Sequence, residues 1–173
     1  MESFLTKLND INTFIFDVDG VLTDGCVFVT ETGVQSRAFN IKDGYALQLA
    51  VKSGYNVAAI SGSRSKSALY RLNSLGIKDV YLGTHTKIDR FKLYTQEKGI
   101  HPSRVMYMAD DIPDLATMQL VGLPVCPADA AEEIKAICSY VSPIPGGRGC
   151  VREVIEKVMK IQGTWMNEKA YSW

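Results

Sequence analysis

Short apolar runs alternate with longer amphipathic segments along most of the chain. The runs are rich in β-favouring residues and end at turns, which is typical of buried strands. The segments between them have helical spacing, and several end directly before a glycine. The expected strands are Thr13–Phe16, Asn56–Ile60, Val80–Leu82, Val105–Met108, Leu123–Val125 and Tyr140–Val141, and the expected helices are Asp43–Ser53, Ser65–Leu75, Lys87–Lys98, Pro113–Val121, Ala130–Ile137 and Val151–Ile161.

This alternation predicts an α/β fold, a Rossmann-like three-layer sandwich with a mostly parallel central sheet. Sheets of this kind carry their chemistry just beyond the carboxyl ends of the strands. We assign residues 1–162 to a single domain. Residues 163–173 show no periodic pattern, and we expect them to form a mobile C-terminal tail.

One segment interrupts the alternation. Cys26–Thr30 and Gln35–Asn40 are both strand-like, and they flank the turn-forming residues Glu31–Val34. The pattern predicts a β-hairpin over residues 25–40, inserted directly after the first strand.

Composition and charge narrow the class of partner. The 173 residues are 46% hydrophobic and 22% charged, which is a globular composition, and the formal net charge is zero. This balance favours neither a nucleic acid nor an anionic membrane as a partner, and no apolar run is long enough to span a bilayer. No secretory signal is visible, and the four cysteines are scattered, so we expect reduced thiols and a cytoplasmic protein.

Two carboxylates follow the first expected strand. Asp17 and Asp19 come directly after the apolar run Thr13–Phe16 and precede Gly20. Charges so close to a buried strand are costly unless a cation or hydrogen bonds compensate them. The segment therefore indicates either a carboxylate pair that binds a metal ion or a solvated Asp-rich turn.

Further polar groups follow the later strands. Each has a simple structural explanation by itself: a capped turn, a solvated lysine, or an acidic helix start. Together they bring two carboxylates, a hydroxyl with a free amide, an ammonium and more carboxylates to one edge of the sheet. After the Asp pair, these groups are Ser61 and Gly62, Lys87, Asp110 and Asp111, and Asp114.

This set of groups meets the needs of phosphoryl transfer. A carboxylate that attacks a phosphate monoester faces like-charge repulsion, which Mg²⁺ held by oxygen ligands relieves. Hydroxyl, amide and ammonium groups hold the phosphoryl oxygens, and a second carboxylic acid protonates the leaving oxygen and later activates water.

The same residues resemble the four motifs of the haloacid dehalogenase superfamily. The matching pieces are Asp17–Val21, Ser61–Gly62, Lys87 and Asp110–Asp114, in order along nearly the whole chain. The resemblance is closest to the small capless sugar-acid phosphatases that act on 3-deoxy-D-manno-octulosonate 8-phosphate. The most family-specific pieces are Val21–Gly25 and Gly146–Glu153.

The resemblance implies a role for each matching residue. Asp17 would be the nucleophile that forms an aspartyl-phosphate, and Asp19 the general acid and base. Mg²⁺ would be bound by both, Asp19 through its backbone carbonyl, and by Asp110. Phosphate would be bound by Ser61, the Gly62 amide and Lys87, while Asp111 and Asp114 would orient Lys87 or metal-bound water.

Two departures from the family pattern stand out, one that bears on backbone geometry at the fourth motif and one that bears on the substrate. Ala109 stands where relatives usually have glycine, and Ser63 stands where relatives often have Arg or Glu. Because this second region faces the substrate in the family, we include Arg64 among the candidate binding residues. The glycine-rich segment around Arg148 is either a flexible loop or a mobile lid whose arginine binds the carboxylate of a sugar acid.

The gaps between motifs, about 40 and about 25 residues, are too short for a separate cap domain. The hairpin is the alternative cover for the site, and the resemblance implies a homotetramer in which hairpins associate. It also implies a Mg²⁺-dependent phosphatase in lipopolysaccharide biosynthesis. The alternatives are a phosphatase of a nine-carbon sialic-type sugar-acid 9-phosphate and a non-catalytic phosphate-binding subunit; a phosphomutase is disfavoured because no cap exists.

Overall fold

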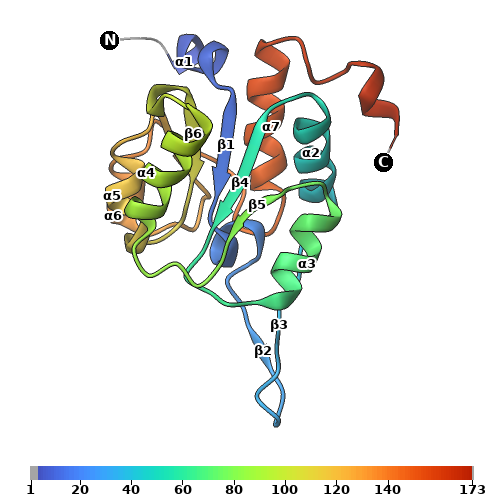
Figure 1. Cartoon of the computed structure of the whole chain (residues 1–173), viewed down its shortest axis with the longest axis vertical. Helices are drawn as coiled ribbons and strands as arrows, with labels where there is room; N and C mark the ends of the chain where they lie inside the picture. The colour runs from blue at the N-terminus through green and yellow to red at the C-terminus, as the bar shows by residue number, and fades with distance from the viewer. Residues whose placement is uncertain (1–3, 173) are drawn as a thin grey trace.

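A six-stranded parallel sheet forms the middle layer of the protein (Figure 1). The computed structural model describes residues 4–172; residues 1–3 and 173, which belong to the predicted domain and tail, lie outside the described residues. The strand order is β5-β4-β1-β6-β7-β8, and each neighbouring pair is parallel. The strands are β1 Thr13–Phe16, β4 Asn56–Ile60, β5 Asp79–Tyr81, β6 Val105–Met108, β7 Leu123–Cys126 and β8 Tyr140–Val141.

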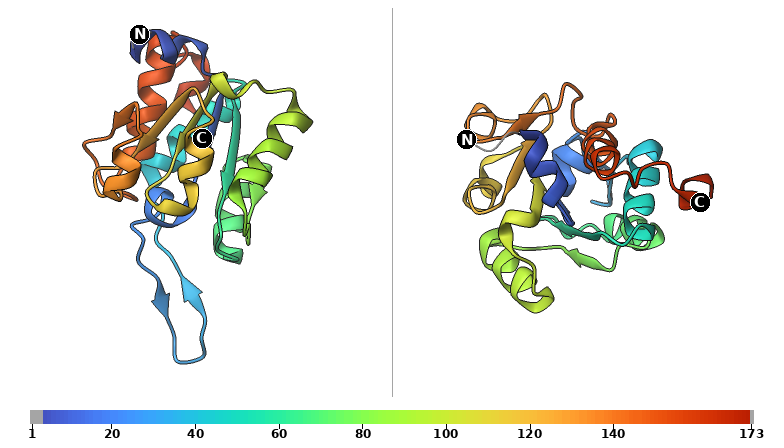
Figure 2. Two further views of the ribbon diagram at one scale, coloured as in Figure 1. Left: turned by 90° about the vertical axis from the view of Figure 1, so that its left-hand side faces the viewer. Right: turned by 90° about the horizontal axis from the view of Figure 1, so that it is seen from above.

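Helices cover both faces of this sheet, so the predicted three-layer sandwich is confirmed (Figures 1 and 2). One face carries four helices, which are α1 Phe4–Asp10, α2 Ile41–Lys52, α3 Lys66–Ser74 and α7 Cys150–Ile161. The other face carries α4 Lys87–Lys98, α5 Leu115–Met118 and α6 Glu132–Lys135. Short helical turns are η1 Val18–Leu22, η2 Pro102–Arg104, η3 Ile112–Asp114 and η4 Glu168–Tyr171.

The central strand β1 divides its side chains between two apolar cores. Phe14 and Phe16 belong to the core under α2 and α7, whereas Ile15 belongs to the core under α4. All three are at most 1% exposed. Because successive side chains of a strand point to opposite faces, a strand buried on both sides is apolar at every position, which is the pattern seen in the sequence.

The predicted hairpin projects from the sandwich as an antiparallel ribbon (Figures 1 and 2). Its strands, β2 Phe28–Val29 and β3 Gln35–Ser36, are shorter than the predicted Cys26–Thr30 and Gln35–Asn40. Both strands are exposed along their whole length. A two-stranded ribbon has no layer to pack on, which limits regular pairing to the residues nearest the turn.

Four helices differ from the sequence prediction by more than one residue at an end. α2 begins at Ile41 with Asn40 as its cap, and Asp43, where the helix was predicted to begin, instead accepts a hydrogen bond of 2.7 Å from the Arg152 amide at the start of α7. α5 and α6 are one-turn helices and shorter than predicted. α1 was not predicted; it is joined to α7 by Gln162, whose side-chain amide donates to the carbonyls of Leu8 and Ile11.

The C-terminal segment was expected to be a mobile tail, and in the structure residues 164–172 contact the sandwich. Trp165 is 6% exposed and meets the ring of Tyr45 edge to face, with 6.2 Å between the ring centroids. The Tyr45 hydroxyl donates to the Ala170 carbonyl, and Asn167 donates to Ser53. The segment therefore packs on α2 and extends the core.

Replacing Trp165 with alanine should destabilise the fold. We expect Trp165→Ala to lower the free energy of unfolding by about 3–5 kcal/mol, because a large buried aromatic side chain is lost. Chemical denaturation followed by circular dichroism measures this. The control is Tyr171→Ala, which removes an aromatic side chain from the same segment that is 78% exposed. Equal effects of the two substitutions would contradict the packing described for the segment.

Candidate active site

Asp17 lies at the carboxyl end of β1 with little freedom to move. Its amide donates to the Met108 carbonyl of the neighbouring strand at 3.0 Å, which continues the sheet pattern by one residue. One carboxylate oxygen, Oδ1, accepts a hydrogen bond of 2.7 Å from the Val18 amide. The chain then turns sharply, and the Thr23 amide donates to the Val18 carbonyl. The turn leaves the second oxygen of Asp17 directed into the site.

The turn after Asp17 requires glycine at position 20. Gly20 has a φ of +86°, which other residues rarely adopt. A β-carbon there would also lie 2.0 Å from Oδ2 of Asp110. Gly20 thus lets the turn after β1 approach the carboxylate that follows β6, and this brings the first and last motifs together.

Lys87 bridges two buried carboxylates. Its ammonium lies 3.0 Å from Oδ2 of Asp17 and 2.6 Å from Oδ2 of Asp114, and its side chain is 6% exposed. The other oxygen of Asp114 accepts a 2.7 Å hydrogen bond from the Tyr107 hydroxyl. The ammonium therefore ties the start of α4 to the ends of β1 and β6.

Burial and like charge shift the titration of this cluster. Burial, followed by the charge of Asp114, raises the pKa of Asp17 to about 7, although Lys87 opposes the shift. Burial also raises the pKa of Asp110 to about 6, with Asp114 and Asp111 contributing in the same direction. Burial alone would lower the pKa of Lys87, but the charges of Asp17 and Asp114 outweigh it and raise that pKa. The site holds more negative charge than its one lysine compensates.

The segment after β4 forms a tight loop suited to an anion. Ser61 is buried and Gly62 is exposed. The Ser61 hydroxyl accepts a hydrogen bond of 3.1 Å from the Ser63 amide, which fixes the side chain at the carboxyl end of the sheet. The Ser61 carbonyl accepts a hydrogen bond from the Thr84 amide at 3.0 Å, which joins the loop after β4 to the loop after β5.

These groups share one cavity of about 500 Å³ at the carboxyl edge of the sheet. Eight of the ten predicted site residues line it, which are Asp17, Asp19, Ser61, Gly62, Lys87, Asp110, Asp111 and Asp114. The remaining two, Arg64 and Arg148, do not line it. Arg64 is exposed and lies against Gly83.

The glycine-rich segment before α7 packs against the turn after β1. A β-carbon at Gly146 would lie 1.9 Å from the Gly20 carbonyl oxygen, and the Gly147 amide donates to the Val21 carbonyl. Arg148 is 67% exposed and pairs with Asp24 at 3.2 Å. The glycines here permit close contact between two backbones, and a lid role for Arg148 stays a prediction.

Three residues of the site or its rim, Thr84, His85 and Arg37, were missed by the sequence analysis, and Ser63 was noted only as a departure from the family pattern. Ser63, Thr84 and His85 line the cavity, and Arg37 binds both carboxylate oxygens of Asp19. The loop residues could have been found from their position after a predicted strand. No local sequence feature indicates that Arg37, which lies on the hairpin, belongs to the site. The isolated His85 gave no reason to expect it beside the Asp cluster.

The acidic groups fit a hard divalent cation. Oδ1 of Asp110 is buried and has no hydrogen-bond partner, although buried carboxylate oxygens are normally bonded. Within residues 4–172, no three His, Cys, Asp or Glu side chains form a metal cluster. The Mg²⁺ ligands that the family resemblance implies do not require such a cluster. They are the carboxylates of Asp17 and Asp110 and the carbonyl of Asp19, and Mg²⁺ commonly keeps several waters.

Removing the bridging ammonium should destabilise the protein. We expect Lys87→Met to lower the free energy of unfolding by about 3–5 kcal/mol, since it leaves buried carboxylates without their partner. The double variant Lys87→Met/Asp114→Asn should lose less than the two single losses combined. Urea denaturation measures both, with Lys98→Met as the control, because Lys98 forms an exposed pair with Asp79 at 2.9 Å. Equal losses for the two lysines would refute the bridging role.

Two curated proteins similar to this chain share one description. No family model matches the chain. Over 168 residues it is 38% identical to the 3-deoxy-D-manno-octulosonate 8-phosphate phosphatase KdsC of Salmonella typhi, covering 97% of this chain and 89% of the relative. The same figures hold for the KdsC protein of Escherichia coli K12.

Solved structures agree with the sequence relatives. The phosphatase of the same description from Yersinia pestis has a TM-score of 0.90 at 36% identity, covering 92% of this chain and 86% of that one. The enzyme from Moraxella catarrhalis, solved in complex with magnesium, phosphate and KDO, has a TM-score of 0.89 at 33% identity, covering 92% and 91%. By sequence and fold, this chain belongs to the 3-deoxy-D-manno-octulosonate 8-phosphate phosphatase family of the haloacid dehalogenase superfamily.

Proposed function

We propose that this chain is a Mg²⁺-dependent phosphomonoesterase that hydrolyses 3-deoxy-D-manno-octulosonate 8-phosphate to the free sugar acid and phosphate, in lipopolysaccharide biosynthesis. The observation that carries the proposal is the buried Asp17 carboxylate, paired with Lys87 and facing the Ser61–Gly62 loop in one cavity. The names of the relatives support the choice of substrate.

In the first step, an oxygen of Asp17 attacks the phosphorus atom. The new O–P bond forms as the bond to the C8 oxygen of the sugar breaks, and Asp19 gives a proton to that oxygen. The Ser61 hydroxyl and the Gly62 amide donate to the phosphoryl oxygens, while Lys87 neutralises their charge. The free sugar acid then dissociates, and the phosphoryl group remains on Asp17 as an aspartyl-phosphate.

In the second step, water attacks the phosphorus of the aspartyl-phosphate. Asp19, now deprotonated, accepts a proton from the water, and the bond to Asp17 breaks to release phosphate. When bound by Asp17, Asp110 and the carbonyl of Asp19, Mg²⁺ supplies positive charge that lets the anionic nucleophile approach the phosphate. Lys87 stays in place through both steps because Asp114 and Asp17 hold it from two sides.

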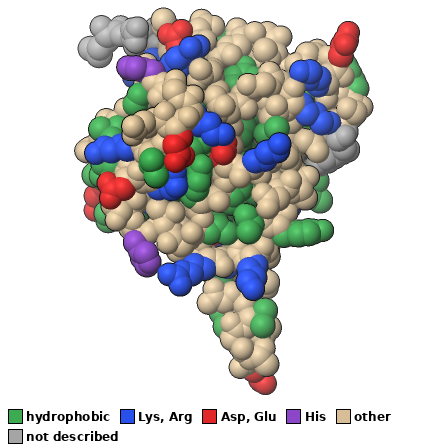
Figure 3. Space-filling model, in the orientation of Figure 1, with side chains coloured by type: hydrophobic (Ala, Val, Ile, Leu, Met, Phe, Trp, Pro, Cys, Tyr) green, Lys and Arg blue, Asp and Glu red, His purple; other side chains and the backbone are tan. Residues whose placement is uncertain are grey.

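We further propose that the active form is a cytoplasmic homotetramer of a single domain spanning residues 1–162. Val27, Phe28, Val29 and Val34 of the hairpin are 39–64% exposed. Hydrophobic side chains are visible along the hairpin in Figure 3. A projecting ribbon with this surface supports association between hairpins.

Among the helices of residues 4–172, none has the length and apolar composition that a membrane span requires.

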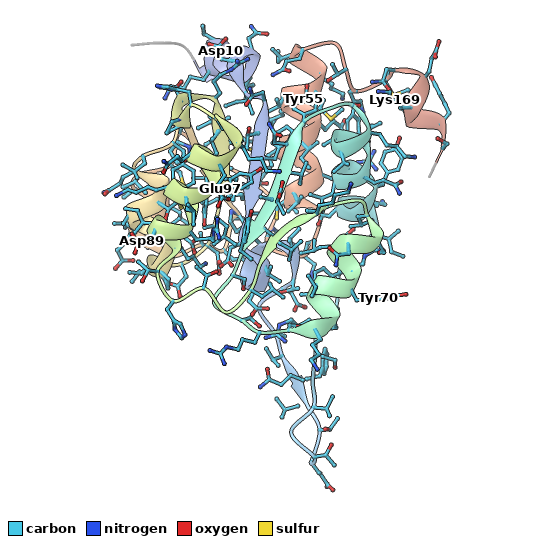
Figure 4. The ribbon with its side chains drawn as sticks, in the orientation of Figure 1. Asp10, Tyr55, Tyr70, Asp89, Glu97 and Lys169 are labelled. Atoms are coloured by element: carbon cyan, nitrogen blue, oxygen red, sulfur yellow. The ribbon has the colours of Figure 1, made fainter. Side chains whose placement is uncertain are left out.

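The purified chain should release phosphate from the sugar-acid 8-phosphate in the presence of Mg²⁺, and chelation should abolish release. Asp17→Asn should lower kcat by at least about 1,000-fold because the nucleophile is lost. Asp89→Asn is the control, since Asp89 is exposed on α4, where Figure 4 labels it. Phosphate release by a coupled assay measures both variants.

A panel of sugar phosphates decides among the alternatives. A higher kcat/KM for a nine-carbon sugar-acid 9-phosphate would replace the proposed substrate by that class. Absence of phosphate release from every member of the panel would leave a phosphate-binding subunit as the function.

The hairpin should control the oligomeric state. We expect sedimentation velocity to show a tetramer for the wild type and smaller species for Phe28→Asp, because a charge on the exposed strand β2 opposes association. Tyr70→Asp is the control; Tyr70 is 80% exposed and points away from α3 (Figure 4). A monomeric wild type, or a tetramer that Phe28→Asp leaves intact, would contradict the proposed assembly.

A further inference from the structure

Arg37 connects the hairpin to the active site. It follows β3 directly, and its guanidinium turns back toward the sandwich, where the side chain is only 5% exposed. Its Nε donates to Oδ1 of Asp19 at 2.5 Å and its Nη2 to Oδ2 at 3.2 Å. Nη2 also donates to the hydroxyl of Ser63 at 3.0 Å. Arg37 therefore joins the general acid to the loop after β4.

This contact competes with the proposed chemistry. Asp19 has to face the leaving oxygen of the substrate, but both of its oxygens are bonded to Arg37 in the free protein. Two parallel hydrogen bonds between a guanidinium and a carboxylate form a strong, directional pair. Arg37 must therefore release at least one oxygen of Asp19 before the leaving group can occupy its place.

A second carboxylate is the group that can replace Asp19. An almost fully buried guanidinium without an anionic partner destabilises the protein, so a neutral hydroxyl of the substrate is a poor replacement for the Asp19 carboxylate. The fork of Arg37 matches a planar carboxylate, and both of its present partners, Asp19 and Ser63, line the cavity. Arg148 is a weaker candidate for the same task, because its side chain is 67% exposed and its partner Asp24 does not line the cavity.

We propose that Arg37 recognises the carboxylate of the sugar-acid substrate, and that this exchange frees Asp19 to face the leaving oxygen. The inference rests on the proposed function for the identity of the substrate. With the phosphate at Ser61 and Lys87, a sugar acid spans the cavity and places its carboxylate toward Arg37. A sugar phosphate without a carboxylate leaves Asp19 paired and is hydrolysed slowly.

Kinetics on two substrates test this role. We measure kcat and KM for the sugar-acid 8-phosphate and for glucose 6-phosphate, which lacks a carboxylate, with wild type, Arg37→Gln and Arg37→Lys. Arg37→Gln should lower kcat/KM for the acid by about 10–100-fold, mainly through KM, because a charge-assisted pair is lost. It should leave kcat/KM for glucose 6-phosphate unchanged or raised, since Asp19 is then free. Arg37→Lys should be intermediate, because it keeps the charge without the fork.

Arg90→Gln is the matched control, because Arg90 pairs with Glu97 at 3.1 Å and does not line the cavity. Arg90→Gln should leave kcat/KM unchanged for both substrates. If Arg37→Gln lowered kcat/KM equally for both substrates with unchanged KM, Arg37 would only orient Asp19. If it lowered kcat/KM for neither substrate, Arg37 would have no role. Each result overturns the proposal.

Binding of the free sugar acid gives a second readout that needs no turnover. Calorimetry with 3-deoxy-D-manno-octulosonate should show at least about tenfold weaker binding to Arg37→Gln than to wild type. If wild type hydrolyses no sugar-acid phosphate, the proposed function fails, and this measurement alone judges Arg37. Equal affinities would overturn its role.

Discussion

The charge balance around the Lys87 ammonium is the interaction on which the rest of the site depends. The parallel sheet brings the carboxyl ends of β1 and β6 together, and this places Asp17, Asp110 and Asp114 in one partly buried space. One ammonium, 3.0 Å and 2.6 Å from two of these acids, compensates only part of their charge. The remaining demand for positive charge is what makes the site suited to a divalent cation and a phosphate ester together.

Much of the fold could be predicted because burial on both sides of a sheet leaves a plain pattern in the sequence. β1 and β4 have the predicted bounds, since each is a continuous apolar run between turns. Helix starts were less predictable, because capping residues have more than one possible partner. Asp43 stands at the predicted start of α2, but its carboxylate accepts a hydrogen bond from α7, which lies far along the chain. The order of the C-terminal segment depends on Trp165 meeting Tyr45, a contact without local signal.

The site shows the same division between local and distant information. Residues that follow a strand, such as Asp17, Ser61 and Asp110, were predicted because the topology gathers strand ends at one edge. Arg37 could not be predicted, since it lies on the hairpin and reaches Asp19 only through the bend of the chain after β3. The substrate-binding role of Arg148 stays a prediction, and the glycines beside it permit close backbone contact with the turn after β1.

In the proposed mechanism, Asp17 carries the phosphoryl group during turnover. The most direct test is to quench the wild-type protein in acid during hydrolysis of the sugar-acid 8-phosphate with Mg²⁺, and to locate any phosphoryl group by tandem mass spectrometry. We expect a phosphoryl group on Asp17 that disappears as the substrate is consumed. A phosphoryl group on a different residue, or none at any quench time during active turnover, would contradict it.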